Sequence, residues 1–220
     1  NRGSCTHPCR WKYSLVEEKR PGEYYPVEED NRGSYIMNSR DLCMLDKLPD
    51  LIDAGISSLK IEGRMKSPFY VATVVSAYRA ALDEYLEDPD NYTFQEKWYK
   101  ELCKASHREF YHGFYYSKPD SSGQNYSSSD YTREYSFIGV VRGYEPDSGL
   151  TIVEQRNKFC VGEDIEVFGP RTDYTDEIVR EMYDGNNNPI ESAPHPQQII
   201  KVKLSKTYPS DFILRKKKES

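Results

Sequence analysis

Phe137-Ile138-Gly139-Val140-Val141 and Leu150-Thr151-Ile152-Val153-Glu154-Gln155 flank the segment Pro146-Asp147-Ser148-Gly149, and together they predict a β-hairpin. The two flanking segments have the length of strands and are rich in β-branched residues, and the segment between them has the composition of a turn. Further strand-length runs, separated by turn signals, follow at 164–168, 177–183 and 199–204. Short strands at this spacing, with no helical pattern between them, predict a small C-terminal antiparallel β-barrel over residues 134–220.

A helical connector with a polar linker is predicted over residues 89–133. Thr93 and Glu96 have the spacing of a capping box, so a helix is expected to begin there and to run to about Ser106. The serine-rich stretch 121–136 has the composition of a loop or linker. Because this polar stretch precedes the predicted strands, we expect the barrel to fold independently of the rest of the chain.

Residues 1–88 alternate between strand-like and helix-like patterns. Short apolar runs at 34–37 and 56–61 are typical of buried strands, and each precedes a helix signal. Ser39 caps a run of leucines at helical spacing, and Ser67 with Pro68 begins a long helix that has one apolar face. The expected face consists of Val71, Val74, Val75, Tyr78, Ala81, Leu82 and Tyr85. The order strand, helix, strand, helix predicts parallel strands with crossover helices.

Charged residues crowd the second of these predicted strands. In an α/β barrel the active site lies at the C-terminal ends of the strands. Alternation places Lys60 and Glu62 on one side of the strand, opposite Leu59 and Ile61. Two opposite charges that point into a barrel interior either pair with each other and order the barrel, or take part in chemistry. The spacing leaves both interpretations open.

More cationic and amide groups are expected at the same rim. Arg64 and Lys66 follow the second strand, Asn38 follows the first, and Arg2 adds a further positive charge. Guanidinium and ammonium groups bind phosphates and carboxylates. The sequence therefore predicts an anionic substrate or cosubstrate at this rim.

Cys5 and Cys9 lie in a short segment of basic and aromatic residues at the start of the chain. A metal or cluster site built from thiolates needs about four ligands. We therefore expect the rest of such a site to lie in a preceding part of a longer protein. The alternative is that the two cysteines are ordinary buried thiols. The sequence contains no His-Glu-x-x-His or Gly-x-Ser-x-Gly signature of a hydrolase.

Composition indicates a soluble protein with more than one domain. The chain has 220 residues, a net charge of −6 and a mean hydropathy of −0.83. No stretch approaches the roughly 20 apolar residues of a membrane span. Five cysteines, an odd number, do not suggest a disulfide framework, so an intracellular, cytoplasmic location is expected.

An acidic chain can hold RNA only through local groups of basic residues. The available cations near the C-terminus are Arg142, Arg156, Lys158, Lys201, Lys203, Lys206 and the tail Arg215-Lys216-Lys217-Lys218. They either contact RNA phosphates or are ordinary solvated charges, and the pattern leaves both interpretations open.

Several motifs resemble, in order, the second half of the collagenase-like (U32) peptidase family. They are Asn1-Arg2-Gly3-Ser4-Cys5, Cys9-Arg10-Trp11-Lys12-Tyr13, Arg20-Pro21-Gly22-Glu23-Tyr24, Tyr35-Ile36-Met37-Asn38-Ser39, Ser58-Leu59-Lys60-Ile61-Glu62-Gly63-Arg64-Met65-Lys66-Ser67 and Asn157-Lys158-Phe159. The resemblance covers nearly the whole chain. It implies the last strand–helix units of a TIM-like barrel, followed by the small C-terminal barrel.

The resemblance also implies a function. Some family members are described as collagenases or proteases, and others act in hydroxylation of tRNA, rRNA or ubiquinone. The hydroxylation members hold a four-iron cluster on four cysteines, and those that act on RNA depend on prephenate. Cys5 matches one cluster ligand and Cys9 matches another, whereas Cys43 matches none and is expected to pack in the core. With two ligands missing, these residues alone are expected to be inactive.

Chemistry favours RNA hydroxylation over peptide hydrolysis. A peptidase needs an activated nucleophile or a metal-bound water, and the sequence shows neither. Thiolates beside a cationic rim suit a cluster and an anionic cosubstrate. The expected partners are thus tRNA or rRNA and the preceding half of the protein. The alternatives are a collagenase-like peptidase acting on peptides and, for the C-terminal barrel alone, an RNA- or partner-binding module like the barrels of translation factors.

Overall fold

The computed structural model describes residues 39–118, 121–123, 125, 131–170 and 173–218, together with residues 11, 13, 14, 16, 21 and 22. The chain divides into two compact units. The first unit combines residues 1–47 with 107–132, and the second combines 48–106 with 133–220. No helix in these described ranges is both long and apolar enough to cross a membrane.

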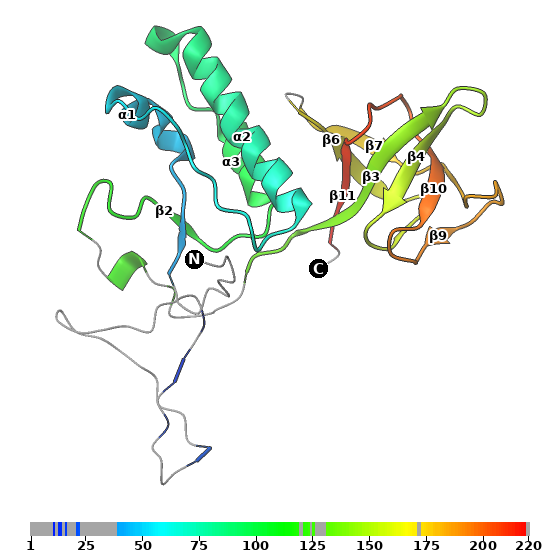
Figure 1. The fold of residues 1–220 in the computed structure, drawn as a ribbon, viewed down its shortest axis with the longest axis horizontal. Coiled ribbons are helices and arrows are strands. Elements are labelled where there is room, and N and C mark those ends of the chain that lie inside the picture. Colours follow the sequence, from blue (N-terminus) through cyan, green and yellow to red (C-terminus); the bar gives the residue numbers. More distant parts are fainter. Residues whose placement is uncertain are drawn as a thin grey trace. The chain divides into compact units, whose positions relative to one another are not determined.

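A seven-stranded antiparallel sheet dominates the second unit (Figure 1). Its strands lie in the order β7-β6-β11-β3-β4-β10-β8. Their bounds are β3 Tyr135–Glu145, β4 Leu150–Gln155, β6 Asp164–Phe168, β7 Thr175–Ile178, β8 Glu181–Tyr183, β10 Ile199–Lys203 and β11 Ile213–Lys217. The short strands β5 (Phe159–Cys160) and β9 (Ser192–Ala193) form a separate antiparallel pair. The predicted hairpin is confirmed as β3 and β4.

The two edges of this sheet meet. Only Val179 and Arg180 separate the edge strands β7 and β8. The amide of Val179 donates to the carbonyl of Glu163 at 3.2 Å, and that of Arg180 donates to the carbonyl of Lys203 at 3.3 Å. The chain therefore passes from one edge of the sheet to the other without leaving it, which curls the sheet around its own apolar face.

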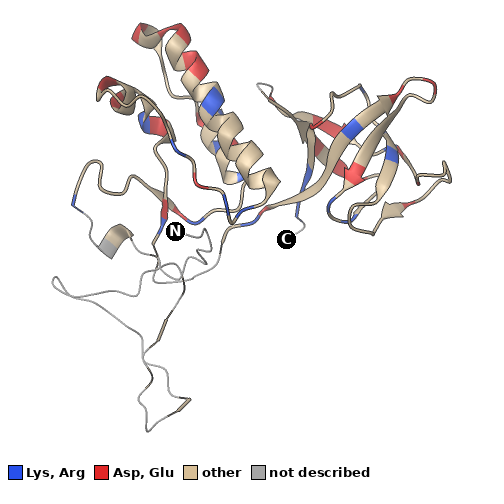
Figure 2. Cartoon of the chain, viewed as in Figure 1, with Lys and Arg blue, Asp and Glu red and all other residues tan. Residues whose placement is uncertain are grey.

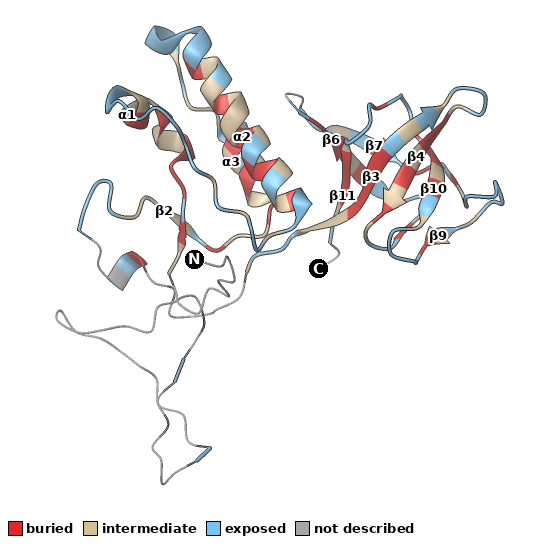
Figure 3. Ribbon diagram, in the orientation of Figure 1, coloured by how far each residue is buried: buried red, intermediate tan, exposed pale blue. Residues whose placement is uncertain are grey.

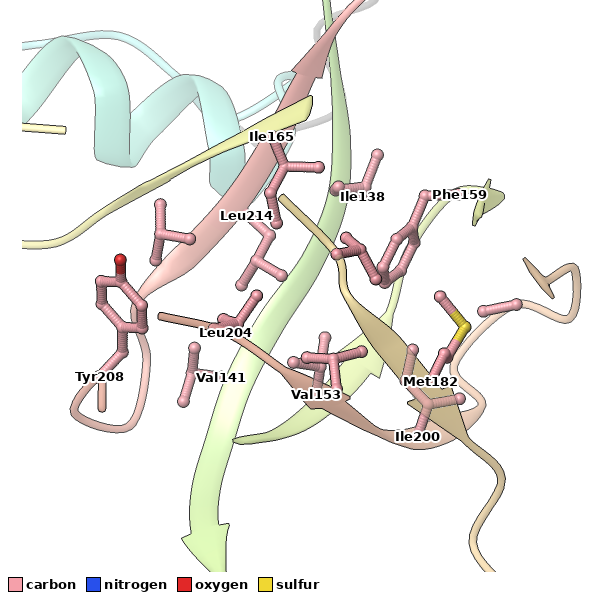
Figure 4. Packing of buried hydrophobic residues seen from close by; sticks show 14 residues of the cluster. Ile138, Val141, Val153, Phe159, Ile165, Met182, Ile200, Leu204, Tyr208 and Leu214 are labelled. Atoms are coloured by element: carbon pink, nitrogen blue, oxygen red, sulfur yellow. The ribbon is translucent and has the colours of Figure 1, made fainter. Parts of the chain in front are cut away.

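The curled sheet encloses the larger hydrophobic core, in which side chains from most of its strands converge (Figure 4). Its buried members are Ile138, Val141, Val153, Phe159, Ile165, Val167, Val179, Met182, Ala193, Ile200, Val202, Leu204, Tyr208 and Leu214. Gly139 is required where β3 meets β4, because a Cβ there would lie 2.6 Å from Cγ1 of Val153. The antiparallel β-domain predicted from alternation is confirmed.

Helices form the rest of the second unit. They are α1 (Leu48–Asp53), α2 (Pro68–Glu87), the 3-10 turn η3 (Pro89–Asn91) and α3 (Glu96–Cys103). As predicted, Ser67 caps α2: its Oγ accepts a hydrogen bond from the amide of Tyr70 at 3.2 Å, and Pro68 occupies the first position. α3, however, begins after Gln95, whose side chain makes no capping bond, so the capping box predicted at Thr93 is wrong.

The buried face of α2 agrees only in part with the predicted one (Figure 3): Val74, Ala81 and Tyr85 are buried as predicted. Its buried residues are Phe69, Thr73, Val74, Ala77, Ala81 and Tyr85. Val71 and Val75 lie on another face and are 38% and 43% exposed. Both faces carry apolar residues at helical spacing, so periodicity alone could not decide which one packs.

The first unit contains a short parallel pair, β1 (Asp41–Leu42) with β2 (Phe110–Tyr111). It also contains the 3-10 turns η2 (Leu45–Lys47) and η4 (Ser121–Gly123). The helix predicted from Ser39 begins later than expected, because residues 41–42 pair with β2 instead. The strand predicted at 34–37 lies outside the described residues.

The strand predicted at 56–61 is not formed. These residues have no regular secondary structure, and Ile56 and Leu59 are 39% and 37% exposed. A strand exists only with a hydrogen-bonded neighbour, and no described segment pairs with this one. The apolar pattern was therefore necessary for a buried strand but was not sufficient to form one.

Candidate functional site

The segment between α1 and α2 carries four of the predicted site residues. Lys60, Glu62 and Arg64 are exposed, and Lys66 is half-buried. The segment turns tightly at its end, where the amide of Lys66 donates to the carbonyl of Gly63 at 3.0 Å. A Cβ on Gly63 would lie 2.8 Å from Cγ2 of Val71, so the turn and the start of α2 need glycine at this position.

Lys60 and Glu62 do not form an ion pair with each other in the described structure, which was one of the two interpretations that alternation left open. Both side chains are exposed, and the described residues include no ion pair that involves either. Oε1 of Glu62 instead accepts a hydrogen bond from the amide of Arg64 at 2.9 Å. Residue alternation holds side chains on one side only in a strand, and no described segment pairs with residues 56–61 to form one.

Positive charge lies along this segment up to the N-terminus of α2 (Figure 2). Nζ of Lys66 donates to the carbonyl of Ser106 at 3.5 Å and lies 5.0 Å from the ring centre of Tyr70. The helix dipole adds partial positive charge at the same end of α2. Lys60, Arg64 and Lys66 with this helix end can attract an anion, and Glu62 is the only carboxylate between residues 60 and 66.

The remaining predicted site residues, Arg2, Asn38, Cys5 and Cys9, lie outside the described residues. The Cys43 side chain is 4% exposed, which confirms its predicted place in packing. Cys103 and Cys160 are half-buried. Within the described ranges no three His, Cys, Asp or Glu side chains are placed to hold a metal ion.

Half of the cations expected to contact RNA are engaged with carboxylates. Arg142 bonds Glu154 at 2.8 Å and Asp211 at 2.9 Å, and Arg156 also bonds Glu154, at 2.6 Å. Further pairs join Lys201 to Glu145 at 2.8 Å and Lys216 to Glu163 at 2.7 Å. Lys158, Lys217 and Lys218 make no ion pair with a described residue. Neighbouring carboxylates therefore offset the charge of these paired cations.

Arg215 is buried, although the sequence suggested a solvated basic tail. Its side chain is 0% exposed. Its guanidinium forms a bidentate pair with Glu101 of α3, in which Nη2 lies 2.8 Å from Oε2 and Nη1 bonds Oε1. Its Nε lies 2.6 Å from Oε2 of Glu166 on β6. Strand alternation could have predicted this burial, because Arg215 lies two residues after the buried Ile213 on β11 and therefore on the same side of the strand.

Lys104 and two tyrosines complete this buried ionic cluster. Nζ of Lys104 lies 2.8 Å from Oε2 of Glu166 and 3.3 Å from Oε2 of Glu101. It also lies 3.5 Å from the ring centre of Tyr174. The hydroxyl of Tyr135 donates to Oε1 of Glu166 at 3.2 Å. Burial and the charge of Glu166 raise the pKa of Tyr135 to about 12, so this phenol stays a donor.

A second buried carboxylate, Glu177, joins β7 to the segment before β11. It is 4% exposed and accepts hydrogen bonds from the Ser205 hydroxyl at 2.6 Å, the Ser205 amide at 2.8 Å and the Tyr208 hydroxyl at 2.6 Å. Burial raises its pKa, but these hydrogen bonds outweigh burial and hold the pKa below its usual value. All partners are internal, so Glu177 serves the fold.

Two family models match the chain. The model of peptidase family U32 matches residues 1–125, and that of the peptidase family U32 C-terminal domain matches residues 133–215. The C-terminal domain of a protein from Geobacillus thermoleovorans assigned to the U32 peptidases has a solved structure. It is 34% identical, covers 37% of this chain and 99% of that chain, and gives a TM-score of 0.35.

Curated relatives carry two kinds of name. The "tRNA hydroxylation protein P1" of Bacillus subtilis is 37% identical over 99% of this chain and 51% of its own length. The "tRNA hydroxylation protein P" of Escherichia coli is 31% identical over 78% of this chain and 46% of its own. A "Collagenase" of Porphyromonas gingivalis is 30% identical over 98% and 51%. The chain thus spans about half the length of these relatives.

Proposed function

The chain belongs to peptidase family U32, and from this premise we propose that the full-length protein acts in the hydroxylation of tRNA, at the wobble uridine. The observation that carries the proposal is the match to the Bacillus subtilis tRNA hydroxylation protein, which extends over 99% of this chain at 37% identity. The match includes both the charged segment before α2 and the C-terminal barrel.

We propose that Lys60, Arg64 and Lys66 hold an anionic cosubstrate, with Arg2 and Asn38 as further contacts. A dicarboxylate such as prephenate, which the family resemblance suggests, fits this charge. The geometry supports the proposal in one respect: three cations and the N-terminus of a 20-residue helix follow one another along a short exposed segment. Glu62, held by the Arg64 amide, is the nearby candidate for moving a proton.

The cofactor that we propose is a four-iron cluster, for which Cys5 and Cys9 would supply two of the thiolates. Such a cluster would supply electron-transfer chemistry, and RNA hydroxylation is an oxidation whereas peptide hydrolysis is not. The remaining two ligands would come from a part of the protein outside this sequence.

The proposed catalytic domain is a TIM-like barrel completed by that same part. Aliphatic side chains that face solvent in the described structure support this arrangement. They are Ile56, Leu59, Met65, Val71, Val75 and Leu86, all between 37% and 58% exposed. Aliphatic groups gathered on one segment and one helix face are typical of surface that packs against protein. The exposed 56–61 segment would then find the strand neighbours that it lacks here.

Peptide hydrolysis is the second candidate, because the Porphyromonas gingivalis relative is named a collagenase. The two functions predict different products. We would compare tRNA nucleosides by mass spectrometry in a strain with the intact gene and a strain without it. Loss of a hydroxylated uridine in the second strain is the expected result. Identical nucleosides in both strains would overturn the proposal and leave the peptidase function.

A further inference from the structure

Three consecutive aromatic residues lie exposed in the first unit. Phe114, Tyr115 and Tyr116 follow β2, and their exposed fractions are 72%, 53% and 54%. A single exposed ring is ordinary on a protein surface, whereas three consecutive exposed aromatic residues are typical of an interaction site. We call residues 112–116 the aromatic loop.

The aromatic loop is held in a defined shape. Nε2 of His112 lies 3.0 Å from Oδ1 of Asp46, and the rings of His112 and Tyr116 meet edge to face at 5.5 Å between centres. The amide of Tyr115 donates to the carbonyl of His112 at 3.3 Å. Gly113 has a φ of 61°, which disfavours any side chain at that position. The turn therefore presents Phe114 and Tyr115 to solvent in a fixed geometry.

The chemistry of this patch differs from that of the exposed apolar residues between positions 56 and 86. Between residues 56 and 86 the strongly exposed apolar side chains are aliphatic, which suits burial against protein. The aromatic loop offers flat rings and phenol hydroxyls instead. Flat aromatic faces stack on unpaired nucleobases, whatever the base. The chain has no carboxylate from Gly113 to Lys118, and the carboxylate contact described for the loop is that of Asp46 with His112.

We propose that the aromatic loop is a stacking platform for unpaired bases of a single-stranded RNA segment, with Phe114 and Tyr115 as the rings in contact. The inference rests on the proposed function, which supplies RNA as the partner. It adds which residues contact the RNA, and that they do so by stacking on its bases. Tyr116, packed against His112, is a positioning residue that holds the turn.

The test uses full-length protein and a fluorescein-labelled single-stranded RNA of ten uridines. Replacing both rings, as Phe114→Leu with Tyr115→Leu, keeps apolar bulk and removes the flat faces. We expect about tenfold or more weaker binding, because stacking contributes at that level for each base. The dependence of affinity on salt should stay the same, since phosphate contacts are untouched. The matched control Tyr115→Phe keeps the ring and should bind like the wild type.

An abasic ribose-phosphate strand of the same length separates stacking from backbone contact. Its affinity should be equal for the wild type and the double variant. Equal RNA binding by these two proteins would overturn the inference, as would an equal loss on the abasic strand, which would indicate phosphate or general surface effects. If the double variant melts at a lower temperature than the wild type, the single variant Tyr115→Leu replaces it in the same comparison.

This test separates the aromatic loop from the proposed function. Unchanged tRNA nucleosides in the gene-deletion strain, together with weaker RNA binding by the double variant, would overturn tRNA hydroxylation and keep the stacking platform. Normal tRNA hydroxylation and normal RNA binding by the double variant would keep tRNA hydroxylation and overturn the stacking platform. A wild-type protein that does not bind the RNA at all, but binds a protein partner through this loop, would also overturn the inference.

Discussion

The guanidinium of Arg215 on β11 forms a bidentate ion pair with the carboxylate of Glu101 on α3, and the Arg215 side chain is fully buried. The pair joins two segments that are far apart in sequence within the second unit. Phe69 of α2 adds apolar contact there, with its ring 5.8 Å from that of Phe137 and 6.2 Å from that of Phe168. The barrel thus has both a charged and an aromatic attachment to the helices of its unit.

Removing the charge of Glu101 should destabilise the second unit strongly. Glu101→Gln leaves the buried Arg215 with one of its two carboxylate partners, and breaking such pairs typically costs about 3–5 kcal/mol. Urea unfolding of the full chain measures the change in the free energy of unfolding. The matched control is Asp83→Asn, which breaks the exposed pair between Arg79 and Asp83 and should cost no more than about 0.5 kcal/mol. Similar losses for both variants would contradict the role assigned to burial.

Residues 133–218 should fold alone, but less stably than in the chain. They contain the whole larger core, yet isolation removes Glu101 and Phe69 and exposes Arg215 to water. We expect a cooperative urea transition at a lower midpoint than that of the full chain. Arg215→Met should cost the isolated barrel less stability than the full chain, because only in the full chain does it leave the carboxylate of Glu101 without its buried partner. No cooperative transition would show that the helices are part of the folding unit.

The hydrogen bonds to Glu177 should make the free energy of unfolding depend on pH. Its folded-state pKa is lowered below the ordinary 4.5, so its contribution is fully present above the unfolded pKa and is lost as the pH falls through the folded value. The wild type should therefore lose stability below about pH 4.5, and Glu177→Gln should lose less over that range. At pH 7 the Gln variant should itself be less stable, by about 1–3 kcal/mol. Parallel pH profiles of the two proteins would contradict this assignment.

Arg64→Ala should weaken the use of an anionic cosubstrate without affecting the fold. Arg64 is exposed and makes no ion pair with a described residue, so its loss should shift the melting temperature little. Its charge should matter in the full-length enzyme, as a higher cosubstrate concentration needed for half-maximal hydroxylation. Arg79→Ala on the exposed side of α2 is the control. A large fall in melting temperature with unchanged cosubstrate dependence would indicate a structural role for Arg64.

The β-domain could be predicted because the residues that determine its hairpin lie close together in the sequence. Alternating apolar residues and the turn at residues 146–149 define the β3–β4 hairpin without knowledge of any other part of the chain. The 56–61 segment carries an equally apolar pattern, but its strand depends on a neighbour that no described residue supplies. On α2, two faces carry apolar residues, and tertiary contacts decide which of the two is buried.

The functional and ionic residues likewise include some that the sequence could predict and others that it could not. Motifs identified Lys60, Arg64 and Lys66 as a cationic segment, and the structure keeps them next to one another because they are close in sequence. The Arg215–Glu101 pair could not be predicted, since its partners are 114 residues apart. Residues 110–116 are rich in aromatic side chains, but the sequence does not report exposure, which distinguishes a stacking surface from a core.

Complementation of a gene-deletion strain tests the central claim, tRNA hydroxylation that depends on Cys5, most directly. Full-length wild type, Cys5→Ser and Cys43→Ser are expressed at matched protein levels, and tRNA nucleosides are quantified by mass spectrometry. The account predicts that the wild type and Cys43→Ser restore the hydroxylated uridine, because Cys43 is a buried packing thiol, and that Cys5→Ser does not. Full restoration by Cys5→Ser, or failure of the wild type to restore the nucleoside, would contradict it.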